Sequence, residues 1–303
     1  MQVWKKKGLI YKCNSIEGLD HYAAVPFVIH YEGDVFRVYY SGRNLMNQSY
    51  VSFFDYDLLK NEIIEDTNLV ILQPGEIGGF DSAGVVLFQI VQFESKRRLY
   101  FSGWSLEKEI PFRFNIGLAQ SETNSEDFRK MSKGPIVGQT IFDPYMAGAP
   151  YVMYDDGLWK MWYISCVEWK LINKKPKHYY KVMYTESNDG VNWFNERKIA
   201  IDFKNDQEFA IARPIVLKED GIYKMWYSYR GEFYNIGYAE SVDGVSWKRL
   251  DDLIVLNPSA AGWDSEMICY PFIVKHKGMK YMFYNGNGYG RTGIGLAVLS
   301  NFK

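Results

Sequence analysis

The chain has 303 residues, of which 35 are Lys or Arg and 36 are Asp or Glu, for a formal net charge of −1 at pH 7. This balance argues against binding of polyanions through net charge, so we expect no nucleic-acid partner. The three cysteines, Cys13, Cys166 and Cys269, are too widely spaced for a disulfide framework, and a single core of this length is typical only of a large all-β or barrel domain.

The N-terminal segment is basic but lacks the apolar core of a signal peptide, and no run in the chain approaches 18 apolar residues. We therefore expect a cytoplasmic protein with no membrane partner. Within this segment, Val3–Ser15 (VWKKKGLIYKCNS) predicts a strand because it resembles Ser246–Ser259 (SWKRLDDLIVLNPS). In both segments a Trp, Trp4 or Trp247, stands ten residues before an Asn.

Five repeats follow, each with an acidic residue well before a pair of aromatic residues. The acid precedes the second aromatic residue by 20 positions in four repeats and by 19 in the remaining one. An apolar run and a tight turn lie between them, and a further strand, a Gly-containing turn and a last strand come after the pair. The acids and second aromatics are, in chain order, Asp20 and Tyr40, Asp81 and Phe101, Asp143 and Tyr163, Glu208 and Tyr227, and Asp264 and Tyr284.

Each repeat predicts four short strands, because Asp-Gly and similar turns favour hairpins and the flanking residues alternate with period two. No long segment has a helical period. Five such units predict a five-bladed β-propeller with four-stranded blades that takes up residues 1–303 as a single domain. Its crowded aromatic residues are expected mostly to pack between neighbouring blades, since large rings bury much area.

The fifth unit ends at TGIGLAVLSNFK, one strand short of four. The N-terminal strand resembles the last strand of the fourth unit, so we expect it to complete the fifth blade and close the ring. Strand alternation then places the tight turns on one face. The longer loops, between second and third strands and between blades, lie on the other face, where each repeated acid is expected to begin an innermost strand around a central channel.

Two interpretations apply to these five acids. Asp81 and Asp264 share a Gly-x-Asp-Ser context, which favours a structural role in bonding the next loop, although both are also candidates for substrate binding. Asp20, Asp143 and Glu208 stand in different contexts. Carboxylates that converge on one channel raise one another's pKa values, which can keep one acid protonated beside an ionised base, as glycosidic cleavage requires.

In this arrangement the chain resembles the five-bladed propeller glycoside hydrolases, families 32, 43, 62, 68, 117 and 130. The resemblance to family 43 implies that Asp20 is the general base, that Asp143 tunes pKa values and orientation, and that Glu208 is the general acid. It also implies an inverting glycosidase. The resemblance covers the whole chain as architecture and three short stretches as chemistry.

The chain departs from the motifs of family 32 at three positions. Phe142 stands before Asp143-Pro144 where that family has Arg, His21 follows Asp20, and Phe209 follows Glu208. The chain is therefore not a plain member of family 32. His21, adjacent to the predicted base, is a further candidate for substrate binding.

Arginines recur on the face with the longer loops. Arg43, Arg230 and Arg291 occupy the loop between second and third strands in three blades that are neighbours once the ring is closed, with Arg213 deeper in the fourth blade. A guanidinium meets two oxygens of a carboxylate or phosphate at once, so these residues predict an anionic sugar or an anionic attacking group. The alternative is that they neutralise the acids or lie in solvent.

Aromatic rings at the channel mouth, Trp104 and Trp169 among them, are expected to stack on the sugar. The basic run Lys170–His178 lies in the longest insertion, as a solvated loop or alternatively as a lid or dimer arm. The histidines lack metal-ligand spacing, so we expect no metal and no cofactor, with a single channel Ca²⁺ left open. The Gly-rich stretch Asn285–Gly293 predicts a turn between strands rather than a nucleotide cradle.

Two other functions stay open at this point. A glycoside phosphorylase or transferase would keep the fold and replace water by another acceptor, as family 130 members do with phosphate. A non-catalytic sugar-binding propeller would use its acids only to hydrogen-bond sugar hydroxyls. Each of these, like the glycosidase, has a carbohydrate as its partner.

Overall fold

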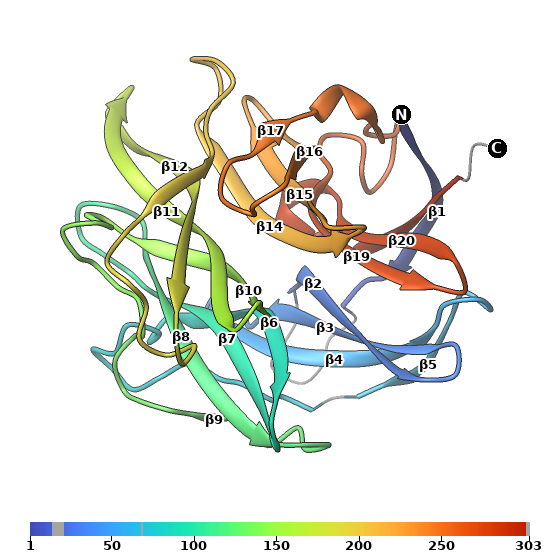
Figure 1. Cartoon of the computed structure of the whole chain (residues 1–303), viewed down its shortest axis with the longest axis horizontal. Coiled ribbons are helices and arrows are strands. Elements are labelled where there is room, and N and C mark those ends of the chain that lie inside the picture. Colours follow the sequence, from blue (N-terminus) through green and yellow to red (C-terminus); the bar gives the residue numbers. More distant parts are fainter. Residues whose placement is uncertain (14–20, 68, 301–303) are drawn as a thin grey trace.

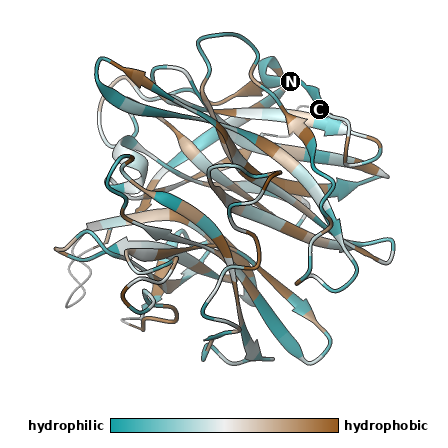
Figure 2. Ribbon diagram, turned by 90° about the vertical axis from the view of Figure 1, so that its left-hand side faces the viewer, coloured by the Kyte–Doolittle hydropathy of each residue, from teal (hydrophilic) through white to brown (hydrophobic). Residues whose placement is uncertain are grey.

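A computed structural model describes residues 1–13, 21–67 and 69–300. Strands make up most of this part, and its two helical segments are short: a 3₁₀ turn, η1 (Asp251–Leu253), and a four-residue helix, α1 (Asn287–Gly290). The predicted all-β class is confirmed. Hydrophobic residues lie mostly within the strands, and hydrophilic residues gather at strand ends and in loops (Figure 2).

Within the described residues, the antiparallel pairings divide the strands into five units of four, numbered here in chain order. Unit one comprises β2 (His21–Glu32), β3 (Val35–Arg43), β4 (Ser49–Asp57) and β5 (Glu62–Asp66). Unit two comprises β6 (Gly84–Phe93), β7 (Lys96–Ser105), β8 (Arg113–Glu122) and β9 (Arg129–Lys130). Unit three comprises β10 (Ala147–Asp155), β11 (Leu158–Ile172), β12 (Lys175–Ser187) and β13 (Lys198–Ile201). Unit four comprises β14 (Ala210–Glu219), β15 (Ile222–Arg230), β16 (Tyr234–Ser241) and β17 (Lys248–Arg249). Unit five comprises β19 (Cys269–His276), β20 (Met279–Asn285), β21 (Ile294–Leu299) and the N-terminal β1 (Gln2–Tyr11), with β18 (Ile254–Val255) parallel to β1.

The first and last strands of the chain, β1 and β21, lie side by side (Figure 1). The N-terminal strand β1 pairs antiparallel with β21, where Trp4 stands opposite Leu299 and Tyr11 opposite Ile294. The first strands of the five units contact one another in turn, β2 with β6, β6 with β10, β10 with β14, β14 with β19, and β19 with β2. The five units are therefore arranged in a propeller-like circuit around their first strands.

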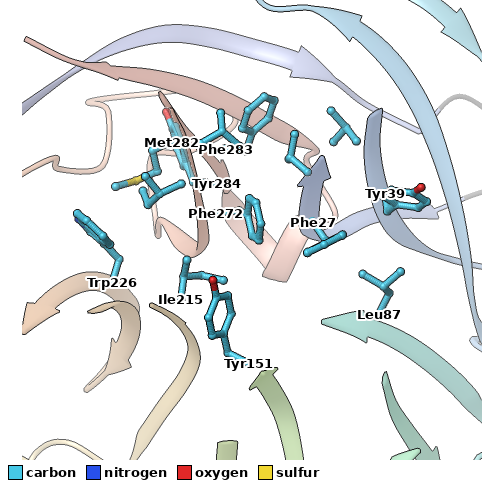
Figure 3. Packing of buried hydrophobic residues seen from close by; sticks show 14 of the residues in the cluster. Phe27, Tyr39, Leu87, Tyr151, Ile215, Trp226, Phe272, Met282, Phe283 and Tyr284 are labelled. Carbon is cyan, nitrogen blue, oxygen red and sulfur yellow. The ribbon is translucent and has the colours of Figure 1, made fainter. Parts of the chain in front are cut away.

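The centre of this circuit is filled with side chains. Each first strand contributes a residue to one hydrophobic cluster, and these residues lie together in Figure 3: Phe27, Leu87, Tyr151, Ile215 and Phe272. All five are buried. Where these five residues lie, the channel expected from the sequence is therefore filled by a packed core.

The aromatic pairs on the second strands are buried between units, as the sequence predicted. Trp162 and Trp226 are both 0% exposed. The Nε1 of Trp162 in unit three donates a hydrogen bond to the carbonyl of Gly244 in unit four at 2.7 Å. In the same way, the hydroxyl of Tyr100 in unit two donates to the carbonyl of Gly190 in unit three at 2.9 Å. A ring of one unit thus fixes a turn of the next.

The turns follow the predicted chemistry with one difference. Asp220 and Gly221, between β14 and β15, both have positive φ (52° and 77°), which matches the twist of a tight two-residue hairpin. Trp193 follows the Asp189-Gly190 turn at the spacing by which Trp247 follows Asp243-Gly244, and this pattern predicts that the last strand of unit three starts there. Trp193 forms only an isolated bridge with Ser187, and β13 begins five residues later at Lys198.

Candidate active site

Strand alternation brings one set of segments to the same face, which we call the mouth face. It comprises the loops between second and third strands (44–48, 106–112, 173–174, 231–233 and 286–293), the strand ends that these loops join, and the starts of the five first strands, with Phe209 directly before β14. The hairpin of β11 and β12 is the longest element of this set. Most of the residues that the sequence singled out for substrate binding lie here.

Four of the five first strands carry a bulge at a residue that precedes proline. Val25, Ala149, Arg213 and Tyr270 have φ between 48° and 56°, and the strand register shifts at each of them. Positive φ is uncommon for residues other than Gly, and bulges re-aim side chains near functional sites. These four residues therefore stand at equivalent places near the top of the core.

Arg213 ties the centre of the circuit together. Its Nη1 donates to the carbonyl of Phe88 at 2.7 Å and its Nη2 to the carbonyl of Pro26 at 2.8 Å, in units two and one. The side chain is buried, and burial lowers the pKa of Arg213 to about 9, which leaves it charged at neutral pH. The sequence predicted that Arg213 contacts substrate. The observed hydrogen bonds favour a structural role instead, as a latch that joins unit four to units one and two and leaves a positive charge beneath the mouth.

A belt of rings runs along the mouth face from unit two to unit five. Phe112 packs against Trp169, with ring centroids 6.2 Å apart, and His178 lies 5.5 Å from Trp169. Further along, Tyr234 lies 6.0 Å from Tyr289. The ring belt is defined by Phe112, Trp169, His178, Phe209, Tyr234, Tyr270 and Tyr289. Most of these rings are only partly buried, so the belt is partly exposed to solvent.

The four repeated acids within the described residues share one arrangement. Each is buried and forms an ion pair within its own unit, with a cation on or just before the outermost strand. The pairs are Asp81 with Lys130, Asp143 with Arg197, Glu208 with Arg249 and Asp264 with Lys6. Each acid thus joins the segment that leads into its unit to the outermost strand of that unit or to the residue just before it.

These pairs correct the expectation that the repeated acids surround a central channel. The hydroxyl of Tyr163 donates to Asp143 at 2.9 Å and the Nε of Arg197 donates to its other oxygen at 3.1 Å, so both oxygens are occupied. Glu208 accepts two bonds from Arg249, at 2.7 and 3.0 Å. Asp143 and Glu208 therefore make the same kind of contact as Asp81 and Asp264, for which the sequence favoured a structural role, and the catalytic roles of Asp143 and Glu208 stay predictions.

The predicted base, Asp20, lies outside the described residues, and its role stays a prediction. His21 begins β2 and pairs through its backbone with Arg43, while its side chain lies outside the described part of the structure. Arg43 ends β3, donates to Asn47 at 2.7 Å and lies over the rings of Tyr22 and Trp104.

The two predicted tryptophans differ in their surroundings. Trp104 is buried and donates to the hydroxyl of Ser49 at 2.7 Å, so it joins units two and one rather than offering an open stacking face. Trp169 belongs to the ring belt. Arg291 borders a separate hollow of about 480 Å³ with Lys12 and Trp263, whereas Arg230 lies against the ring belt, so the structure gives these two arginines different neighbours.

Other chemistries find little support in the described residues. No group of three or more His, Cys, Asp or Glu side chains there could hold a metal ion. Burial raises the pKa of Cys166 to about 11, which disfavours a thiolate nucleophile. Across the described ranges, no helix has the length and apolar character needed to cross a membrane.

Four residues of the mouth face were not assigned to substrate binding from the sequence: Lys177, His178, Phe209 and Tyr234. Lys177 and His178 belong to the basic run Lys170–His178, which forms the ends of β11 and β12 and the turn between them. Their place in the longest insertion of the repeat was the sequence signal that could have marked these two residues for substrate binding. Phe209 directly follows the repeated acid Glu208, and the repeat pattern contains no signal for a ligand-binding ring at that position.

The comparisons with known proteins begin with relatives in sequence. No protein-family model matches the chain. Two curated proteins of Mycobacterium tuberculosis, "Uncharacterized protein MT1551" and "Uncharacterized protein Rv1502", are each 37% identical over 300 residues, covering 98% of this chain and 99% of the relative. The chain belongs to the same family as these two proteins. Because the match to this family runs almost from end to end, it includes all five units.

Solved structures of glycoside hydrolases share the fold of this chain. A structure of the protein BT0996, described as an RGII complex, has a TM-score of 0.76 at 16% identity, covering 99% of this chain and 92% of that protein. A thermostable family-43 glycoside hydrolase has a TM-score of 0.69 at 16% identity, covering 97% and 94%. An exo-1,5-alpha-L-arabinanase from a bovine ruminal metagenomic library has a TM-score of 0.63 at 12% identity, covering 96% and 97%. The fold is that of the propeller-like glycoside hydrolases, as the sequence resemblance indicated.

Proposed function

We propose that the five units are the blades of a five-bladed propeller closed by β1, and that the protein cleaves a glycosidic bond at the mouth face. The circuit of contacts among the five first strands supports the architecture. The likeness to glycoside hydrolases supports carbohydrate cleavage. The substrate in this proposal is an anionic sugar.

The observation that carries the proposal is the ring belt on a glycosidase fold. Sugar rings present apolar C–H faces that pack on aromatic side chains, while binding sites combine such surfaces with a few polar groups. Trp169 and Tyr289 are partly exposed rings of the belt in units three and five, and Arg230 lies 5.4 Å from the ring centroid of Tyr289. A sugar with a negative group can contact both kinds of residue here.

Hydrolysis with inversion requires one carboxylic acid to protonate the leaving oxygen and one carboxylate to activate water. Asp20 stays the proposed base. Asp143 and Glu208 are held in buried ion pairs, so their proposed catalytic roles require that those pairs open when substrate binds. An inverting outcome would appear as the opposite anomeric configuration in the first released sugar.

A second candidate is a glycoside phosphorylase or a related transferase, which needs fewer free carboxyl groups than hydrolysis does. The ion pairs of Asp143 and Glu208 favour it for that reason. In phosphorolysis, a phosphate oxygen forms the new bond to the anomeric carbon while the bond to the leaving oxygen breaks. That oxygen takes a proton from a single acid. Phosphate thus replaces the water and the carboxylate that activates it, so one carboxyl group suffices.

Aryl glycosides with neutral and anionic sugars, assayed with and without phosphate, test both candidates. Release of the aryl group from anionic glycosides without phosphate supports the glycosidase, and release only with phosphate supports the phosphorylase. Tight binding without turnover, weakened by Trp169→Ala, would mean a sugar-binding protein. If no glycoside of the panel is either turned over or bound, the proposed function is refuted.

A further inference from the structure

Three basic groups from two units gather around one aromatic ring in the belt. The Nζ of Lys177 lies 3.6 Å from the ring centroid of Phe209, and the Cζ of Arg230 lies 5.1 Å from it. The ring of His178 lies 6.1 Å from the same centroid. Lys177 and His178 come from β12 of unit three, whereas Arg230 ends β15 of unit four. Phe209 precedes β14 and stands where the two units meet.

Within the described residues, no carboxylate neutralises this group. Glu168, on the same hairpin as Lys177, forms an ion pair with Lys170 at 2.8 Å. Glu232, near Arg230, supplies only its backbone carbonyl, which accepts from the Nε of Arg230 at 3.4 Å. Like charges held close together on partly buried side chains repel each other, and an anion between them removes that cost.

Other crowded cations of this chain do have acidic partners. Lys160 and Lys218 share Asp155, each at 2.8 Å. Arg249 contacts both Glu208 and Asp251 at 2.7 Å. The cluster at Phe209 therefore differs from these two clusters, in which a carboxylate lies between the cations or beside them.

Two buried nitrogen atoms beside this cluster also lack hydrogen-bond partners. They are the Nε1 of Trp169, which is always a donor, and the Nε2 of His178. The two residues stand opposite each other on β11 and β12, with ring centroids 5.5 Å apart. A buried polar group without a partner is unfavourable, so a ligand oxygen that accepts a hydrogen bond from either nitrogen would stabilise the site.

Burial and the two neighbouring cations also affect protonation. They lower the pKa of His178 to about 4, with burial the larger cause, followed by Arg230 and Lys177. The groups that face the imidazole are the rings of Phe112, Trp169, Tyr180 and Phe209 together with those two cations. The imidazole is therefore neutral at pH 7, and a bound anion would favour its protonation.

We propose that Lys177, His178 and Arg230, gathered around Phe209 with the indole of Trp169 alongside, form an oxyanion subsite that binds a phosphate or carboxylate group. The assignment of that group to a sugar substrate rests on the proposed function, whereas binding of the anion does not. None of the sequence-predicted arginines other than Arg230 takes part. The oxyanion subsite would place a negative group at the boundary of units three and four, with the remaining rings of the belt free for the sugar.

The experiment measures anion binding directly on the full-length protein. Inorganic phosphate and glucuronate are titrated by calorimetry against the parent protein at matched ionic strength, with chloride as the control anion. In parallel, histidine-labelled protein is followed by NMR against pH with each anion. The chain has four histidines, and His178→Phe identifies the signal of interest.

We expect saturable binding of phosphate or glucuronate, with the pKa of His178 rising toward its ordinary value of about 6.5. Lys177→Met and Arg230→Met should each weaken binding by at least about tenfold, which corresponds to 1.4 kcal/mol. Arg291→Met is the matched control and should bind like the parent, because Arg291 borders the separate hollow with Lys12 and Trp263.

Equal binding in the parent, Lys177→Met and Arg230→Met would overturn the subsite, as would a His178 titration that is the same in phosphate, glucuronate and chloride. Loss of binding only in Arg291→Met would assign the anion to the other hollow. Anion binding without turnover of any glycoside would leave the subsite standing and remove the proposed enzyme. Turnover without anion binding would do the reverse.

Discussion

Replacing Glu208 by Gln separates its two proposed roles. The carboxylate is 6% exposed and accepts bonds from Arg249 at 2.7 and 3.0 Å and from the backbone N–H of Lys204 at 2.8 Å. Removing one partner of a buried ion pair costs about 3–5 kcal/mol when the other charge is left alone. Arg249 keeps Asp251 at 2.7 Å, so we expect a smaller loss of about 2–3 kcal/mol in the free energy of unfolding.

Urea unfolding followed by tryptophan fluorescence and circular dichroism gives this free energy. Glu232→Gln is the matched control, because Glu232 is an exposed glutamate in the mouth-face loop 231–233 without an ion pair, and a change within about 0.5 kcal/mol is expected. Arg249→Met and the double variant with Glu208→Gln complete a cycle that isolates the coupling between the two side chains.

An interpretation in which Glu208 acts only in catalysis makes the opposite prediction. A general acid contributes about 10²–10⁴ to the rate, so Glu208→Gln would then lose that factor in kcat while its unfolding midpoint stayed near that of the parent. That result would refute the structural interpretation of the ion pair. A destabilised variant whose folded fraction keeps its turnover would support it.

Three further predictions concern other parts of the molecule. Deleting residues 1–14 removes β1 and exposes the edge of β21, so the product should aggregate or melt far below the parent, and an unchanged melting temperature would contradict the pairing role of β1. Arg230→Lys should raise KM for the true substrate while Arg291→Lys should not, because lysine keeps the charge but loses the planar fork; steady-state kinetics on anionic glycosides would show the reverse if Arg291 holds the substrate. The pKa of His178 is about 4 in the folded protein and about 6.5 in the unfolded chain. Its pH-dependent contribution to the free energy of unfolding, up to about 3 kcal/mol, is therefore fully present above pH 6.5 and is lost as the pH falls toward 4. As the pH is lowered from 8 to 4, the urea midpoint should therefore decrease more for the parent than for His178→Phe. Equal decreases in the two proteins would count against the buried neutral imidazole.

Several features of the fold could be predicted from the sequence because they repeat. The aromatic pairs, such as Trp226 and Tyr227, are buried where the spacing placed them. The strand seen in Val3–Ser15 pairs with β21, since a segment that resembles the outer strand of one unit has the pattern needed in another. The repeat thus identified strands and their order before any contact was known.

The role of the repeated acids could not be predicted in the same way. Spacing fixed the position of Asp143 in its unit, but the side chain that pairs with it, Arg197, lies 54 residues further along. For Asp264 the partner is Lys6, 258 residues away. A carboxylate near a strand start looks the same in sequence whether it faces a substrate or a cation. The partner is set by how the outermost strand folds back over its unit.

The residues at the four strand bulges give the mouth its chemical character. Val25, Ala149 and Tyr270 are not acids, and the fourth, Arg213, is a buried cation held by two backbone carbonyls. Among the described residues, the repeated acids are neutralised in ion pairs while Arg213 is bonded only to carbonyls, so Arg213 adds an unbalanced positive charge near the top of the core. If Arg213 is a latch, Arg213→Met should reduce the free energy of unfolding, because two buried carbonyls lose their donors at about 1–3 kcal/mol each. Phosphate affinity should change less in this variant than in Arg230→Met, since both terminal nitrogens of Arg213 already have partners. Weaker phosphate binding with unchanged stability would instead make Arg213 part of the ligand site.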